Sequence, residues 1–147
     1  MNITQLRKEI ELDEGKINKI YKDHLGYPTF GIGHLIITSD PEYGQAIGTS
    51  VSEDRVIEAF NNDICKVLSD CEKLYPDFYD LPEEAQLIIA NMMFNLGYTR
   101  LSKFKNMKAA VDARNWKLAS LEMKDSTWYN QVRNRADRLV KRMALVN

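Results

Sequence analysis

Residues 87–94, in the second half of the sequence, would be apolar on nearly every side if they formed a helix. A helix without a polar face must be surrounded by other elements, because apolar side chains are unfavourable in water. The helical pattern starts at Glu83 and stops at Gly97, since glycine commonly follows the last residue of a helix. The sequence therefore predicts a buried central helix and, around it, a lobe made mainly of helices.

Several other segments have the spacing of amphipathic helices. In the first of them Thr4 is a candidate N-cap and Gly15 is a natural stop. A second helix would begin after Ser52, its candidate N-cap, and extend to Leu74. At about 22 residues it would be about 33 Å long, enough to connect two lobes. Three more candidate helices cover residues 101–113, 115–124 and 132–144.

Residues 17–37 have a different character. They are rich in strand-forming side chains and are interrupted by glycines, and Pro28 restricts its own strand to an edge or a turn. This pattern predicts a small antiparallel meander of two or three strands. Residues 38–50, which are mostly turn formers, should then be a loop.

We therefore expect a mostly helical α+β fold in a single domain, residues 1–147. A small N-terminal lobe, about residues 14–52, would contain the meander. The long helix, about residues 53–74, would connect it to a helical C-terminal lobe. That lobe would consist of residues 75–147 together with the first helix, residues 3–13.

The composition is that of an ordinary globular protein, with 44% hydrophobic residues, 28% charged residues and a formal net charge of −1. No apolar run approaches the roughly 20 residues that cross a bilayer, so we expect no membrane insertion. The polar start of the chain lacks the apolar core of a secretory signal, which predicts accumulation in the cytoplasm. Basic residues are matched by acidic ones, and aromatic residues do not alternate with basic runs, so no nucleic-acid partner is indicated.

The sequence gives no sign of a metal or a cofactor. The two cysteines, Cys65 and Cys71, lie about 9 Å apart along the predicted long helix and on different faces, too far for a disulfide. We assign both to packing. No Cys/His spacing suits a metal site. The run Gly31-Ile32-Gly33 lacks the third glycine of a nucleotide-binding loop.

Two carboxylates in the first part of the chain have an unusual setting. Glu14 lies at the predicted end of the first helix, and Asp23 begins the meander. Thr29 follows on the next predicted strand, so antiparallel pairing would bring its hydroxyl back beside Asp23. A carboxylate and a hydroxyl side by side can bind one water molecule. Cleavage of an acetal requires an acid for the leaving oxygen and a carboxylate on the opposite side of the sugar, so the pattern suits a glycosidase.

The same segment resembles the T-even bacteriophage lysozymes, also called phage muramidases or endolysins. The family pattern is Asp-Glu-Gly at the end of the first helix, then Tyr-Lys-Asp, then Gly-Tyr-x-Thr-x-Gly-Ile-Gly-His-Leu. These strings occur here at residues 13–15, 21–23 and 26–35. The resemblance covers most of the chain, because it resumes at residues 59–63, 91–97, 128–131 and 134–136.

The resemblance implies a lysozyme-like fold and hydrolysis, without a cofactor, of the β-1,4 bond between N-acetylmuramic acid and N-acetylglucosamine in peptidoglycan. On this basis Glu14 is the general acid, Asp23 activates or positions the water, and Thr29 helps to hold that water. Such enzymes resemble inverting glycosidases, whose two carboxyl groups stand about 6.5–9.5 Å apart to admit the water. Glu14 should remain protonated near working pH, while the more exposed Asp23 stays ionised.

The resemblance also suggests substrate contacts. Leu35 and Phe94 match residues that line the saccharide cleft of the family. Met107 and Glu122 occupy two more cleft positions, where a serine and an asparagine are usual, so the affinity of the subsites should differ. The interlobe loop and the C-terminal tail are shorter than in the best-known members. The near-neutral charge predicts weaker attraction to an anionic wall than in strongly basic lysozymes.

Some of these residues also have purely structural interpretations. Asp23 could serve an Asx turn, and Thr29 could be only a strand former. His34 could be a catalytic base, but the resemblance favours a structural ion pair with Asp63, which would raise the pKa of His34 and stabilise the fold at low pH. A basic stretch near the C-terminus could be a solvated helix face or could contact an anionic wall polymer; it contains Arg133, Arg135, Arg138, Lys141 and Arg142.

The biological role implied by the resemblance is that of a monomeric endolysin in host cell lysis. It would wait in the host cytoplasm until a holin opens the membrane, and would then act on the periplasmic cell wall. Two alternatives stay open. A lytic transglycosylase would need the acid but not the bound water, and would leave a 1,6-anhydro sugar. A catalytically idle wall-binding or tail-associated module would not lyse peptidoglycan at all.

Overall fold

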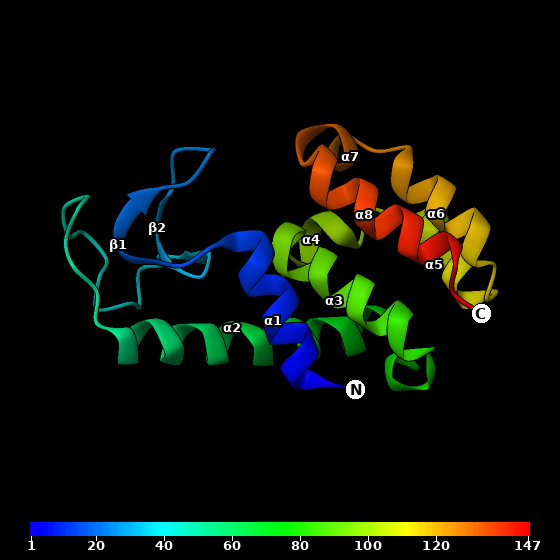
Figure 1. Ribbon diagram of the computed structural model, residues 1–147, viewed down its shortest axis with the longest axis horizontal. Coiled ribbons are helices and arrows are strands. Elements are labelled where there is room, and N and C mark those ends of the chain that lie inside the picture. Colours follow the sequence, from blue (N-terminus) through cyan, green and yellow to red (C-terminus); the bar gives the residue numbers. More distant parts are fainter. The chain divides into compact units, whose positions relative to one another are not determined.

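The computed structural model describes all 147 residues as eight α-helices, one short 3-10 helix and a three-stranded sheet (Figure 1). The fold is mostly helical α+β, as the sequence predicts. The chain divides into two compact units, Arg7–Lys66 and Met1–Leu6 with Val67–Asn147. Both boundaries fall inside helices, α1 (Ile3–Glu14) and α2 (Glu53–Leu74), so each of these helices contributes residues to both units.

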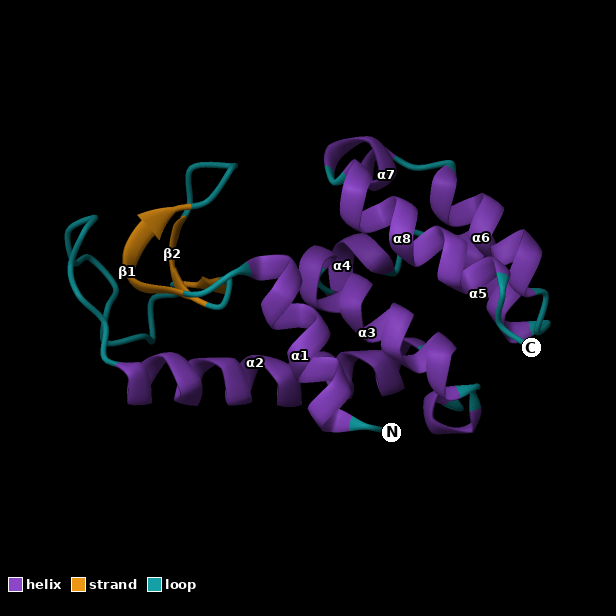
Figure 2. Cartoon of the chain, viewed as in Figure 1, coloured by secondary structure: helices purple, strands orange, loops and turns teal.

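All three strands belong to the unit Arg7–Lys66, and Figure 2 distinguishes them from the helices by colour. The sheet is antiparallel throughout and its order follows the chain, which confirms the predicted meander. Pro28 is the first residue of the second strand, a position where the missing N–H of proline is tolerated. The strands are β1 (Ile17–Lys22), β2 (Pro28–Gly31) and β3 (His34–Leu35).

The stretch predicted as a loop, residues 38–50, contains turns and returns to the sheet at its end. The Ile20 amide donates to the Thr49 carbonyl at 2.9 Å, and the Gly48 amide donates to the Ile20 carbonyl at 2.8 Å. Lys19 and Ser50 form an isolated antiparallel bridge. The end of the loop thus lies along the outer edge of β1, and it pairs with backbone N–H and C=O groups that an edge strand would otherwise expose.

The core of this unit is formed by apolar side chains of α1, the sheet and α2. Phe30, in the middle strand, is fully buried. Burial of this apolar surface is the main favourable contribution to folding of so small a unit. The other large buried side chains of this unit are Ile10, Ile20, Ile32, Ile36, Val51, Val56, Phe60 and Ile64.

The other unit is built around α3 (Glu83–Leu96), whose side chains are buried over most of its length. The prediction of a buried central helix is confirmed. Gly97, at φ +78°, ends α3, and its amide donates to the Met93 carbonyl. The remaining elements of the unit are η1 (Phe78–Asp80), α4 (Tyr98–Leu101), α5 (Lys105–Asp112), α6 (Trp116–Lys124), α7 (Thr127–Gln131) and α8 (Arg133–Ala144).

Two helix predictions need correction. The first helix is capped by Asn2 and not by Thr4, because the Asn2 side-chain oxygen accepts from the Gln5 amide at 3.0 Å. The helix predicted over residues 101–113 is interrupted between α4 and α5. Phe104 has a non-helical backbone there, and its ring packs edge-on against Trp128, with centroids 6.4 Å apart. Neither glycine nor proline marks this break in the sequence.

Two smaller points concern the membrane and the thiols. None of the helices combines the length and the apolarity that crossing a bilayer requires. Cys65 is exposed and Cys71 is buried, and both are free thiols, as their spacing predicts.

Candidate active site

Glu14 is the last residue of α1, and its half-buried side chain packs over the meander. The helix ends because Gly15 adopts φ +75°, while its amide still donates to the Glu11 carbonyl at 2.8 Å. The Glu14 carboxyl lies directly against the α-carbon of Gly33: a β-carbon there would be 2.5 Å from Oε1. The missing β-carbon of Gly33 therefore leaves the space that this carboxyl occupies.

Asp23 closes the turn between β1 and β2. Its Oδ1 accepts from the Leu25 and Tyr27 amides, each at 2.9 Å, which is an Asx turn. The Asp23 amide also donates to the Tyr27 carbonyl at 2.9 Å. One carboxylate oxygen is thus committed to the turn, and the other, Oδ2, has no protein donor. The structural and the chemical interpretations of Asp23 are compatible, because they use different oxygens.

Thr29 lies in the middle strand and is only 3% exposed. Its hydroxyl donates to the Tyr27 carbonyl at 2.9 Å. The single proton of the hydroxyl is committed in this way, so Oγ1 can act towards a further group only as an acceptor.

The register of the sheet places a further residue directly across from Thr29. The partner of Thr29 on β1 is Tyr21, and Asp23 follows two residues later. Side chains two residues apart in a strand point to the same face, and direct cross-strand partners share a face. By this alternation Tyr21, Thr29 and Asp23 face the same way, with Asp23 the diagonal neighbour of Thr29. Sequence reasoning placed Thr29 beside Asp23 and missed Tyr21, which the alternation along the strand could have indicated.

Electrostatics place Tyr21 near both carboxylates. Burial, followed by the negative charges of Glu14 and Asp23, raises the pKa of the Tyr21 phenol above its usual value of 10.0. The phenol therefore stays neutral over the range in which a glycosidase works. The charges of both carboxylates therefore act on Tyr21.

His34 is bound between two carboxylates. Its Nδ1 lies 2.8 Å from Asp63 Oδ2, and its Nε2 lies 2.9 Å from Asp40 Oδ2. Burial acts to lower the pKa of His34, but the hydrogen bonds and charges of Asp63 and Asp40 outweigh burial and raise it above 6.5. The structure therefore brings His34 and Asp63 together and adds Asp40, which sequence reasoning missed.

A single arginine of α2 connects this histidine to the loop. Arg55 makes two 2.9 Å hydrogen bonds to the Glu42 carboxylate and one of 3.1 Å to Asp40. Its guanidinium also lies 5.4 Å from the centre of the Phe30 ring. Hydrogen bonds from Arg55 lower the pKa of Glu42, which is only 8% exposed. This network fixes the loop of residues 38–50 over the unit's core.

The predicted substrate contacts lie in different surroundings. Leu35 is 49% exposed on β3, in the unit Arg7–Lys66, whereas Phe94 is half-buried at the end of α3. Met107 and Glu122 belong to the other unit and border one small pocket between α5 and α6. Met107 is only 1% exposed, so its side chain is part of the core and offers almost no surface to a ligand. Glu122 is half-buried and remains a candidate contact.

No group of three or more His, Cys, Asp or Glu side chains is arranged to hold a metal ion. The fold and the match to a known family together define the class of the protein, a lysozyme-type glycoside hydrolase.

Comparison with known proteins then gives the family. Residues 11–144 match the phage lysozyme family, and the chain belongs to it. A probable T4-type lysozyme of Dictyostelium discoideum is 27% identical, over 94% of this chain and 92% of its own length. The pre-baseplate central spike protein Gp5 of Enterobacteria phage T4 is 30% identical over 86% of this chain, which corresponds to 25% of Gp5. The peptidoglycan hydrolase gp36 of Pseudomonas phage phiKMV is 29% identical over 94% of this chain and 15% of gp36.

Proposed function

We propose that the chain hydrolyses the β-1,4 bond between N-acetylmuramic acid and N-acetylglucosamine in peptidoglycan, with inversion at the anomeric carbon. The observation that supports this most concerns the two oxygens of the Asp23 carboxylate. Oδ1 accepts from the backbone amides of the turn, whereas Oδ2 has no protein donor. Membership of the phage lysozyme family and the peptidoglycan hydrolase among the relatives support the choice of substrate.

Glu14 donates its proton to the glycosidic oxygen as the bond to the anomeric carbon breaks. The carboxyl is suited to this because the end of α1 and the backbone of Gly33 restrict its position on two sides. A fixed acid requires little reorganisation at the moment of proton transfer.

A water molecule attacks the anomeric carbon from the opposite side of the sugar ring. Asp23 Oδ2 and Thr29 Oγ1 are both acceptors, since the Thr29 proton is bound to the Tyr27 carbonyl. The water gives one hydrogen bond to each of them, which leaves an oxygen lone pair free to attack. Its oxygen bonds to the anomeric carbon, one of its protons passes to Asp23, and Glu14 ends ionised. Proton exchange with solvent restores both carboxyls.

Digestion of purified peptidoglycan in ¹⁸O-water tests this proposal. Mass spectrometry should find one ¹⁸O at each new reducing end, and proton NMR at early times should find the inverted anomer. A 1,6-anhydro product without ¹⁸O would establish a lytic transglycosylase instead. Glu14→Gln serves as the control and should release no product.

We further propose that the protein acts in host lysis from the cytoplasm, as a monomer that reaches the periplasmic wall once a holin opens the membrane. Expression in a Gram-negative host should then lyse cells only when the inner membrane is permeabilised. The likeness to the spike protein Gp5 favours a second role, in entry, as a tail-associated wall hydrolase. Detection of the chain in purified virions by mass spectrometry would favour that role over lysis.

A further inference from the structure

The formal net charge of −1 conceals a strong asymmetry along the chain. Residues 98–147 contain twelve Lys and Arg but only four Asp and Glu, a formal charge of +8. Residues 1–97 contain eight Lys and Arg and seventeen Asp and Glu, a formal charge of −9. The near-neutral total therefore does not describe the surface of α4 to α8, which is strongly basic.

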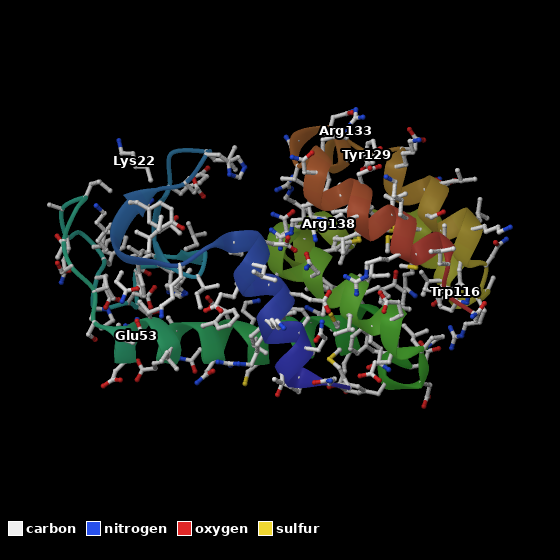
Figure 3. All side chains as sticks on the ribbon, in the orientation of Figure 1. Lys22, Glu53, Trp116, Tyr129, Arg133 and Arg138 are labelled. Carbon is white, nitrogen blue, oxygen red and sulfur yellow. The ribbon has the colours of Figure 1, made fainter.

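Three exposed cations around α7 are positioned by neutral groups. Arg100 donates to the Gln131 side-chain oxygen at 3.2 Å, and Arg133 donates to the Asn130 side-chain oxygen at 3.0 Å. The Tyr129 ring completes the set, with the Arg133 guanidinium 4.5 Å and the Lys124 ammonium 5.9 Å from its centre. Tyr129 and Arg133 are labelled in Figure 3, where α7 meets α8. We call Arg100, Lys124 and Arg133 the cationic platform.

The charges of the platform are not neutralised by ion pairs, in contrast to other basic residues of the same unit. Lys108, Arg114, Lys141 and Arg142 each form an ion pair with an Asp or Glu side chain. Asp137 lies near the platform: it accepts from the Tyr129 hydroxyl at 2.9 Å, pairs with Lys141 at 2.9 Å, and has its pKa lowered by hydrogen bonds from Lys141 and Tyr129 and by the charges of Lys141 and Lys124. The platform is therefore ordered by contacts that leave its positive charge available.

The surroundings of the platform indicate what it can bind. Tyr129 is only 6% exposed, and Arg133 and Lys124 lie over its ring, so it offers little aromatic surface for stacking on a nucleobase. Guanidinium groups bind carboxylates through parallel hydrogen bonds, and their charge attracts a polyanion over about one Debye length. Several cations gathered around one short helix suit a polymer that carries many carboxylates.

We propose that the cationic platform docks on the carboxylates of the peptidoglycan stem peptides. This rests on the proposed function, because that polymer is the substrate. Docking raises the local concentration of the enzyme on an insoluble wall and supplies attraction that the net charge of the whole chain does not suggest.

Sedimentation with purified wall sacculi, stripped of lipids and phosphate polymers, tests the proposal. The binding protein carries Glu14→Gln to prevent digestion. The triple variant Arg100→Gln, Lys124→Gln, Arg133→Gln should bind roughly tenfold more weakly at low salt and should show a flatter salt dependence. The matched control removes three exposed lysines elsewhere, Lys8→Gln, Lys66→Gln and Lys117→Gln, and should bind within about threefold of the parent.

Further binding measurements separate the proposal from its alternatives. Amidation of the stem carboxylates should weaken binding of the parent to the level of the platform variant. Arg100→Lys with Arg133→Lys, which keeps both charges, should retain most of the binding and shows that loss is not due to misfolding. Equal losses in the platform and control variants, or parent binding to anionic phospholipid vesicles but not to sacculi, would overturn the proposal. If sacculi are bound but never hydrolysed by the unmodified protein, the proposed function fails and the docking surface stands.

Discussion

The carboxyl group of Glu14 lies so close to the backbone of Gly33 that a β-carbon added there would force the carboxyl to move. A β-carbon on Gly33 would lie 2.5 Å from Oε1 and 3.0 Å from Cδ of Glu14. Gly33 also has φ +65°, a conformation that other residues rarely adopt. Glycine therefore suits the backbone conformation of this turn, and its missing β-carbon leaves the space that the Glu14 carboxyl occupies.

Gly33→Ala should impair catalysis more than it impairs folding. The backbone strain should lower the free energy of unfolding by about 1–2 kcal/mol. The new methyl group must also displace the Glu14 carboxyl, so we expect peptidoglycan hydrolysis to fall more than tenfold at a temperature where the variant is folded. Turbidity assays on sacculi and urea denaturation measure the two effects separately.

Gly44→Ala is the matched control for this prediction. Gly44 has φ +84°, but a β-carbon there would meet nothing within 4 Å. Its variant should lose similar stability and keep its activity. If both variants kept full activity, Gly33 would not position the acid.

The two oxygens of Asp23 predict different effects for two substitutions. Asp23→Asn keeps a side-chain oxygen for the Leu25 and Tyr27 amides, so this variant should unfold near the temperature of the parent. It should nevertheless hydrolyse peptidoglycan about 10²–10⁴-fold more slowly, because the base is lost. Asp23→Ala should lose both the turn and the activity. Thermal unfolding by circular dichroism, together with turbidity assays, makes the comparison; an active Asp23→Asn enzyme would contradict the base role.

The parts of the fold that the sequence predicts well are those specified by local signals. The helix α2 begins after Ser52, whose hydroxyl accepts from the Arg55 amide at 3.2 Å, and extends to Leu74 as its apolar periodicity indicates. The meander follows from strand-forming residues separated by glycines. In both cases neighbours in the sequence determine the element, so no tertiary information is required.

The parts that could not be predicted depend on long-range contacts. The pairing of β1 with β2 shifts register between Ile17 and Tyr21, so Ile17 pairs with Gly31 and not with Gly33, the residue that a regular ladder would place there. Glu42 lies in a segment with turn composition, where an acid is normally solvated. It is buried because Arg55, thirteen residues away, binds both of its oxygens. No signal in the neighbouring sequence predicts the contact between Arg55 and Glu42.

Tyr21 offers a direct test of the geometry of the site, because its pKa is raised by burial, by Glu14 and by Asp23. Glu14→Gln and Asp23→Asn should each lower the pKa of the Tyr21 phenol relative to the parent, since each removes one negative charge. Asp13→Asn is the control and should leave the pKa of Tyr21 unchanged, because Asp13 is not among the charges that act on this phenol. Titration of ¹³Cζ-labelled tyrosine by NMR, with Tyr21→Phe to assign the signal, measures the shift. A response to only one carboxylate would show that the two do not flank Tyr21.

The contacts of His34 predict how stability depends on pH. Its folded-state pKa is raised above 6.5, so the protonated ring is favoured in the folded protein. This stabilisation is fully present below the unfolded value and is lost as the pH rises through the folded pKa. The pKa of Asp40 is lowered below 3.8 by hydrogen bonds from the Ile37 amide and His34 and by the charge of Arg55, although burial opposes this. Its contribution is present above that value and is lost as the pH falls through the folded pKa.

The free energy of unfolding should therefore be highest in the mildly acidic range, between the folded-state pKa values of Asp40 and His34. Urea denaturation from pH 4 to pH 9 should show a decline on the alkaline side that disappears in His34→Gln. Asp40→Asn should reduce that decline without removing it, because the 2.8 Å contact of His34 Nδ1 with Asp63 remains. An NMR titration that found the pKa of His34 at or below 6.5 in the parent would contradict the pairing, whatever the denaturation curves showed.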